Sequence, residues 1–337
     1  MNHSFENSSL VSSDLENRNL ENSHLKFLDE FREKDLIISL TSKLKSVVKK
    51  DKQYQFMEFC GGHTHAIFQF GLQSLLPPNI RLIHGPGCPV CVLPRGRIDA
   101  CIELLNARPD IVLCTYGDLM RVPGSEGTSF IKLKAQGKDI RMVYSPIDAV
   151  LLAEKFQNEK PNEKSGDISG ENATKKVVFL AIGFETTAPA TALALQMAKQ
   201  KQLNNFFVYC LHLLTPPAIG SVLESPVVRE VGTISLDGFI GPGHVSTVIG
   251  VRPYDYFAEE YKKPVVITGF APSDILYALI ELVEMCNNQR AQVVNAYKRV
   301  VADEGNLKAQ ELMAEMFELR REFEWRGLGN VPYSALK

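Results

Sequence analysis

The regular alternation of short apolar runs with helix-length amphipathic stretches is the feature that most constrains the fold of this 337-residue chain. Between the apolar runs, segments 97–107, 147–156 and 188–201 carry apolar residues at helical spacing. Such alternation predicts an α/β fold with mostly parallel sheets that helices cover on both faces. The expected strands are 54–59, 80–84, 110–114, 141–144, 177–182, 206–211 and 264–268.

Composition shifts divide the chain into five expected segments. Two Rossmann-like α/β domains are expected, separated by a stretch of Asn, Glu, Lys, Ser and Gly that has almost nothing to bury. The segments are a disordered polar tail (1–26), a first α/β domain (27–156), a surface insertion or linker (157–176), a second α/β domain (177–270) and a helical C-terminal segment (271–337). Within the last segment, the expected helices are 274–286, 291–302 and 306–325.

Charge and hydropathy exclude several classes of protein. Lysine plus arginine number 37 against 39 acidic residues, so no broad basic surface for nucleic acid or an anionic membrane is expected. No apolar run approaches the roughly 18 residues that a membrane helix needs, and the polar N-terminus lacks the apolar segment of a secretory signal. Seven cysteines are too few, and too odd in number, for a disulfide scaffold. We therefore expect a soluble cytoplasmic protein.

Four glycine-rich segments follow strands or apolar runs. Because the carboxyl ends of parallel strands form the binding crevice of an open α/β sheet, these segments are expected at one edge. Glycine there lets the backbone approach a ligand closely. None of the four fits a dinucleotide fingerprint or a phosphate-binding loop, so nucleotide binding is not expected. The segments are 60–65 (CGGHTH), 85–91 (GPGCPVC), 183–187 (GFETT) and 241–246 (GPGHVS).

The first of these segments is a candidate metal site. It places the thiol of Cys60 and the imidazoles of His63 and His65 within six residues, directly after a strand. Thiolate is a soft ligand for iron, zinc or copper(I), and imidazole ligates metals or donates hydrogen bonds. The alternative is a Gly-Gly turn that carries surface histidines.

The second segment contains Cys88 and Cys91 in a C-x-x-C at a turn. This spacing serves either half of a zinc site or a redox dithiol. A structural zinc site needs a second ligand pair, which only Cys60 and the nearby histidines offer, whereas redox chemistry needs no further ligand. We favour the redox interpretation, and an inert pair is the third alternative.

The other cysteines and several polar residues have plainer expected roles. Buried cysteine behaves as a small hydrophobe, and the remaining four are expected to be structural. His84 and His212, which lie at strand ends, are expected to be hydrogen-bonded, and Glu185 is either a crevice residue or a first-turn acid stabilised by the helix dipole. The four structural cysteines are Cys101, Cys114, Cys210 and Cys286.

Taken in order, these segments resemble those of the hydrogenase maturation factor HypD family. The resemblance runs from about residue 58 to the late helices. It is specific because several independent motifs agree in order and spacing. Besides the four glycine-rich segments, it covers 115–118 (TYGD), 121–125 (RVPGS), 253–255 (PYD), 268–270 (TGF) and 272–274 (PSD).

The resemblance implies a scaffold for the Fe(CN)2CO group of [NiFe] hydrogenase rather than a turnover enzyme. The scaffold acts with the small protein HypC, receives cyanide from HypE and passes iron on to the hydrogenase large subunit. Cys60 would hold the iron, and Cys88 and Cys91 would supply electrons. The resemblance further implies that Gly61 and Gly62 approach the iron ligands, that His63 and His65 assist, and that Glu185, Thr186, Thr187 and His244 line the crevice.

In one respect the sequence departs from the family pattern. Members carry four further cysteines that hold a [4Fe–4S] cluster, and this chain has no cysteine after Cys286. We therefore expect no ligands for that cluster here, because the sequence is either truncated or lacks that electron relay. Two rival hypotheses remain: a thiol–disulfide oxidoreductase that uses Cys88 and Cys91 alone, and a partner-binding fragment without assembly activity.

Overall fold

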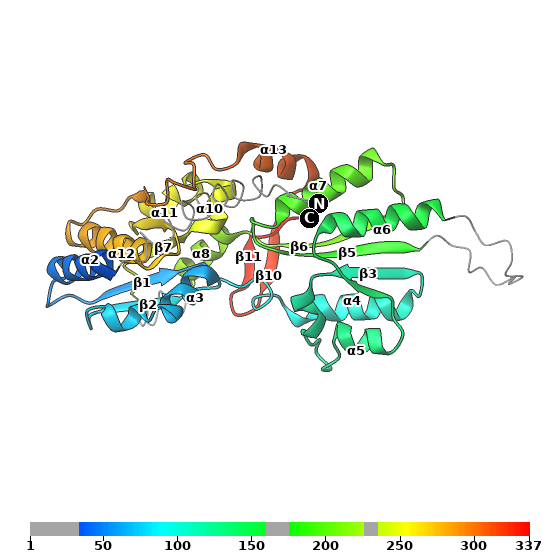
Figure 1. Ribbon diagram of the computed structural model, residues 1–337, viewed down its shortest axis with the longest axis horizontal. Coiled ribbons are helices and arrows are strands. Elements are labelled where there is room, and N and C mark those ends of the chain that lie inside the picture. The colour runs from blue at the N-terminus through cyan, green and yellow to red at the C-terminus, as the bar shows by residue number, and fades with distance from the viewer. Residues whose placement is uncertain (1–33, 160–174, 226–234) are drawn as a thin grey trace, which may run out of the picture.

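The computed structural model describes residues 34–159, 175–225 and 235–337. The expected tail (1–26) and most of the expected linker (157–176) lie outside these ranges. Within them, two parallel sheets lie at opposite ends of an elongated molecule (Figure 1). None of the helices in these ranges has the length and apolar character needed to cross a membrane. The α/β class with two Rossmann-like sheets is confirmed.

The first lobe contains a five-stranded parallel sheet in the order β2-β1-β7-β8-β9. Its core has two layers: α2, α3 and α12 pack on one face, and α8 and α11 pack on the other. The strands are β1 (Tyr54–Glu58), β2 (Ile80–His84), β7 (Gly238–Pro242), β8 (Val265–Thr268) and β9 (Val293–Asn295). The helices are α2 (Lys34–Val47), α3 (Gly61–Gln69), α8 (Thr215–Glu224), α10 (Gly243–Ile249), α11 (Asp255–Glu259) and α12 (Pro272–Asn287).

The second lobe contains a four-stranded parallel sheet in the order β4-β3-β5-β6. Helices α4 and α5 cover one face, and α6 and α7 cover the other (Figure 1). The strands are β3 (Ile111–Thr115), β4 (Ile140–Met142), β5 (Lys176–Gly183) and β6 (Phe206–His212). The helices are α4 (Arg95–Ala107), α5 (Phe130–Ala135), α6 (Pro146–Asn158) and α7 (Ala188–Gln200), and short 3-10 turns lie at Leu72–Leu75, Gly117–Arg121 and Arg252–Tyr254.

Membership of the two sheets does not follow the expected division of the chain at 157–176. Strands β1 and β2 lie in one sheet with β7–β9 from far along the chain, whereas β3 and β4 lie in the other sheet with β5 and β6. The chain thus leaves the first lobe after β2, builds the second lobe, and returns. Sheet pairing is decided by which strand edges meet in space, and local sequence does not encode it.

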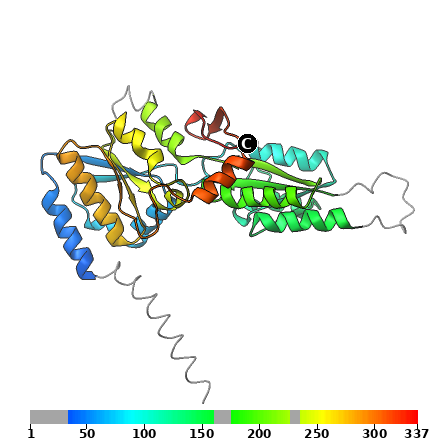
Figure 2. The ribbon, with the colours of Figure 1, turned by 90° about the horizontal axis from the view of Figure 1, so that it is seen from above.

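The C-terminal segment is only partly helical. Helix α13 (Leu307–Met316) lies across the junction of the lobes, as Figure 2 shows from above. The expected helix at 291–302 is wrong, because 293–295 form edge strand β9. The expected helix at 306–325 is also too long, since β10 (Glu322–Trp325) and β11 (Gly329–Pro332) form a hairpin. Phe323 and Trp325 alternate with exposed residues in β10, the period of a strand, and Trp325 stacks on Phe184 of the second lobe.

Central strand β7 has no counterpart among the expected strands. Its glycine-rich sequence, GFIGP, has low strand propensity. A Cβ on Gly238 would lie 2.9 Å from the carbonyl oxygen of Pro264, and one on Gly241 would lie 2.3 Å from the Ile267 side chain. Glycine is therefore required here by close packing between strands, which the sequence pattern does not reveal.

Candidate functional site

The parallel strands of the first lobe bring three of the glycine-rich segments to one edge. Cys60 follows β1, Gly85 follows β2 and Gly243 follows β7, and all three strands run in the same direction. Their carboxyl ends therefore open on one side of the sheet, where ligands bind in open α/β folds. The fourth segment, at Gly183, ends β5 in the other sheet.

Cys60 lies at the centre of this edge. It is the N-cap residue of α3 with an extended backbone, and 8% of its surface is exposed. Its Sγ lies 3.8 Å from Nδ1 of His244, which belongs to α10 and is exposed. Burial raises the pKa of the Cys60 thiol and lowers the pKa of His244. A thiol and a neutral imidazole thus face each other at a partly open position, and both are potential soft-metal ligands.

The aromatic ring of Phe270, the last residue of the TGF motif, fixes both imidazoles. Phe270, just after β8, stacks on His244 with ring centroids 3.9 Å apart and on His63 at 4.6 Å. His63 is fully buried, and its Nε2 lies 3.0 Å from the carbonyl oxygen of Gly269. Burial lowers the pKa of His63 to about 4. His63 therefore supports the site from inside, whereas His65 is exposed on α3.

Close approach requires glycine at position 62, in the Cys60 segment, and at position 87, in the loop after β2. A Cβ on Gly62 would lie 2.7 Å from the Phe270 ring. At Gly61, the loop after β2 comes close: a Cβ on Gly87 would lie 2.7 Å from the Gly61 nitrogen. Glycine at position 87 thus lets the loop that carries Cys88 lie directly against the backbone of the Cys60 segment, and glycine at position 62 leaves room for the Phe270 ring.

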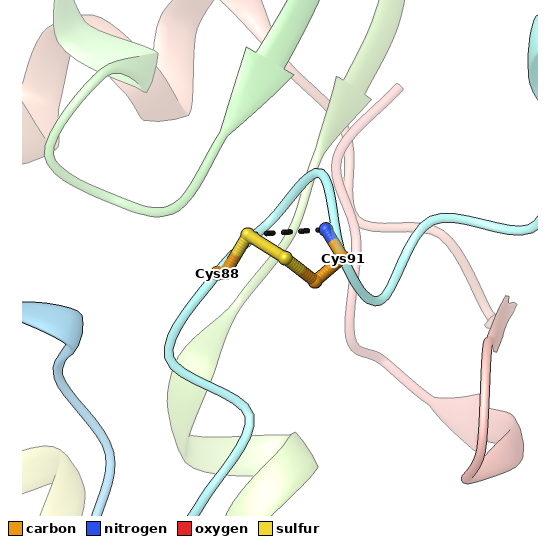
Figure 3. The surroundings of a disulfide bond; sticks show 2 residues. All are labelled: Cys88 and Cys91. Carbon is orange, nitrogen blue, oxygen red and sulfur yellow. Dashed lines mark hydrogen bonds between the residues drawn. A yellow bond between two sulfur atoms is a disulfide. The ribbon is translucent and has the colours of Figure 1, made fainter. Parts of the chain in front are cut away.

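Cys88 and Cys91 form a disulfide in that loop, with their Cα atoms 5.3 Å apart (Figure 3). The backbone N–H of Cys91 also donates to Sγ of Cys88 at 3.2 Å. Val92, directly after the pair, is buried in the core of the second lobe. The disulfide therefore lies where the chain crosses between lobes, and the exposure of Cys91 leaves it accessible to a reductant.

A buried carboxylate two residues before Cys60 was not among the expected site residues. Glu58 ends β1 and is 1% exposed. It accepts hydrogen bonds from the backbone N–H of Cys60 at 2.9 Å and from the Thr64 hydroxyl, and Nδ1 of His84 lies 2.9 Å from its Oε1. A charged residue at the end of an otherwise apolar strand was the available signal, because such a group is rarely buried without partners. The expected hydrogen-bonded role of His84 is confirmed.

The edge of the second lobe is organised differently. Glu185 is buried and accepts from the backbone N–H and hydroxyl of Thr215 at 2.6 and 2.9 Å, so it caps α8 rather than its own helix α7. Desolvation raises its pKa to about 7. Thr187 is the N-cap residue of α7 and donates to the Phe184 carbonyl, and Thr186 is exposed. Buried His212 bonds Thr191 at 2.8 Å, as expected of a hydrogen-bonded histidine.

Glu185 also borders an apolar cavity of about 350 Å³ at the junction of the lobes. Pro216 and Ile249 line it from the side of the first lobe, and Phe317 lines it from the segment after α13. The carboxyl group is therefore the main polar feature of an otherwise apolar wall.

The remaining cysteines do not gather with Cys60. Cys101, Cys114 and Cys210 are buried, Cys286 is partly buried, and burial raises the pKa of each thiol. Across residues 34–159, 175–225 and 235–337, no three His, Cys, Asp or Glu side chains form a group that could hold a metal ion. The site at Cys60 and His244 thus offers two ligands, fewer than a resident structural metal requires.

Comparison with known proteins identifies the family. Residues 35–337 match the family model HypD, described as "Hydrogenase formation hypA family". The chain is 55% identical to hydrogenase maturation factor HypD2 of Bradyrhizobium diazoefficiens, over 93% of this chain and 78% of the relative. It is 55% identical to HypD of Rhizobium leguminosarum bv. viciae, over 93% and 77%, and 43% identical to HypD of Escherichia coli, over 93% and 79%. The chain therefore belongs to the HypD family of hydrogenase maturation factors.

Proposed function

We propose that this protein is the scaffold on which the Fe(CN)2CO group of [NiFe] hydrogenase is assembled. The observation that carries the proposal is the juxtaposition of the Cys60 thiol, the His244 imidazole and the loop that bears the Cys88–Cys91 disulfide. Iron is the cargo of this site rather than a resident cofactor.

The ligand set suits a cargo. Cys60 supplies one soft thiolate, and His244 lies within reach as a second ligand or as a hydrogen-bond donor to the bound group. Two protein ligands leave room for cyanide, carbon monoxide and a ligand from a partner. HypC would provide that co-ligand, HypE would deliver cyanide, and the hydrogenase large subunit would receive the iron by way of HypC.

The second element of the proposal is the redox pair. Oxidation of the Cys88 and Cys91 thiols to their disulfide releases two electrons and two protons. Because their loop lies against Gly61, beside Cys60, the electrons are released close to the iron. Glu185, Thr186 and Thr187 would face the crevice from the second lobe, where a carboxyl group with a pKa of about 7 can hold a proton near neutral pH.

Infrared spectroscopy tests this function directly. The chain is isolated anaerobically with HypC and examined where metal-bound cyanide and carbonyl absorb. Two cyanide bands and one carbonyl band are expected. A folded, iron-free complex without these bands would contradict the scaffold and favour a fragment that only binds its partner.

The exposed disulfide supports a second candidate, a thiol–disulfide oxidoreductase. This activity would need Cys88 and Cys91 and would not involve Cys60. Cys60→Ala separates the two functions, because a reductase keeps its disulfide-exchange rate whereas a scaffold loses its iron.

A further inference from the structure

Glu58 is a buried group that contacts both the Cys60 segment and the end of the neighbouring strand β2. Its Oε2 accepts from the backbone N–H of Cys60 at 2.9 Å. Its Oε1 accepts from the hydroxyl of Thr64, one turn into α3, and lies 2.9 Å from Nδ1 of His84 at the end of β2. Both carboxylate oxygens are therefore occupied by groups from different elements.

The backbone of Glu58 adds a further link to the same loops. Its carbonyl oxygen accepts from the N–H of Gly85 at 2.8 Å, at the start of the loop that leads to Cys88. A Cβ on Gly85 would lie 2.7 Å from that oxygen. His84 is held in turn by the ring of Phe68 from α3, with ring centroids 5.3 Å apart. Glu58 thus joins the Cys60 segment, the first turn of α3 and the disulfide loop.

We propose that Glu58 is a positioning residue that holds the Cys60 thiol beside His244 and keeps the disulfide loop next to the Cys60 segment. This inference rests on the proposed function only in naming Cys60 as the iron ligand. A carboxylate is needed because its contacts are with hydrogen-bond donors, two of them at Oε1 and one at Oε2. Glutamine has the same shape, but it would direct an amide N–H₂ at one of these donors.

The chain contains its own controls for a test. Cys101, Cys114 and Cys210 are buried in the core of the second lobe or against its helices, so their alkylation reports opening of that lobe and global unfolding. The full chain is treated with iodoacetamide at one pH without reductant, and the rate at each cysteine is measured by peptide mass spectrometry. The variants are Glu58→Gln, Thr64→Val and Thr64→Ser.

The expected result is a rate increase confined to Cys60. Glu58→Gln should raise it at least tenfold, while the rates at Cys286 of the first lobe and at Cys114 and Cys210 of the second stay within twofold of the original chain. Thr64→Val keeps the charge of Glu58 but removes one donor, and should raise the rate about threefold. Thr64→Ser restores the hydroxyl and should return the Cys60 rate to within twofold of the original chain. Because both Thr64 variants keep Glu58, they separate a loss of thiol position from a loss of the Glu58 charge.

Two outcomes would overturn the proposal. An unchanged Cys60 rate in both Glu58→Gln and Thr64→Val would show that the network does not hold the thiol. A parallel rise at Cys60 and at Cys286, which packs against the core of the same lobe, would show that Glu58 only stabilises the fold. If Glu58→Gln does not fold, the Thr64 pair decides the matter by the same criteria.

The infrared experiment keeps this inference separate from the proposed function. A selective rise at Cys60 in a chain whose complex with HypC shows no cyanide bands would reject the scaffold and retain the positioning role. Cyanide bands in the original complex, together with an unchanged alkylation rate in the variants, would support the scaffold and reject the positioning role of Glu58.

Discussion

The carboxyl edges of the two sheets are alike in topology and unlike in chemistry. At the edge of the first lobe, the Cys60 thiol faces an exposed imidazole, and the carboxylate of Glu58 supports it from behind. At the edge of the second lobe, the carboxyl of Glu185 caps a helix and the imidazole of His212 bonds a buried threonine. A glycine-rich loop after a parallel strand therefore marks where a site can form. Accessible ligands are what make only the first edge a candidate metal site.

Among the changes that test this comparison, replacement of Cys60 should have the largest effect, a loss of bound iron. Cys60→Ser should lower iron retention in the complex with HypC at least tenfold, because a serine hydroxyl is a hard, protonated group and a poor replacement for thiolate. Iron per complex is measured by metal analysis. Cys210→Ser, at the end of the other sheet, is the matched control and should retain its iron. Equal retention in the two variants would remove the distinction between the edges.

The next largest effect is expected from Glu185, whose titration should change the free energy of unfolding with pH. Its pKa is raised from 4.5 to about 7, so the native state binds the proton more tightly than the unfolded chain. Stability is therefore lost as pH rises from about 4.5 through 7, by up to about 3 kcal/mol. Glu185→Gln should remove this loss and be more stable than the original chain at pH 8, with a much smaller difference at pH 4.5.

Urea unfolding at several pH values measures the effect of Glu185→Gln. Identical pH profiles for the two proteins would mean that Glu185 is not desolvated as the structure shows. A variant with the expected pH profile that nevertheless fails to assemble Fe(CN)2CO would show that the second edge also contributes to the chemistry, and so would sharpen the comparison.

Substitution of Gly62 should have an intermediate effect. Gly62→Ala places a Cβ 2.7 Å from the Phe270 ring, so the ring that stacks on His63 and His244 must shift. We expect a loss of about 1–3 kcal/mol in unfolding free energy, typical of overpacking. The accompanying signature is a shift of the His244 ring resonances in NMR spectra. Gly96→Ala, where an added Cβ meets nothing within 4 Å, is the control and should leave both measurements nearly unchanged.

The smallest effect is expected at Thr187. Thr187→Val keeps the branched shape but removes the hydroxyl that donates to the Phe184 carbonyl at 3.0 Å. We expect about 1 kcal/mol of destabilisation in thermal or urea unfolding, the usual contribution of one hydrogen bond. Thr187→Ser retains the hydroxyl donor and should lose less unfolding free energy than Thr187→Val. A loss well above 3 kcal/mol would indicate that the second edge depends on more than local hydrogen bonds.

Much of the fold could be predicted because it follows from local pattern. The strands near 54–58, 80–84 and 176–183 were recognisable from their apolar runs, and helices α4, α6 and α7 from their periodicity. Local pattern does not predict strand β7 or the β10–β11 hairpin. Glycines in β7 are favoured by contacts with neighbouring strands, and β10 is stabilised by packing against Phe184. Such long-range contacts override local propensity.

For the site, the sequence by itself determined the reactive groups: the Cys60 thiol, the C-x-x-C pair and the motifs that carry the resemblance to HypD. Only the tertiary structure decided that His244 and not His63 faces the thiol, that Glu185 caps α8, and that Glu58 joins the loops around Cys60. The physical reason is that a residue type limits which chemistry is available to a side chain. Its burial and its partners, many of which come from distant segments of the chain, decide which part of that chemistry is used.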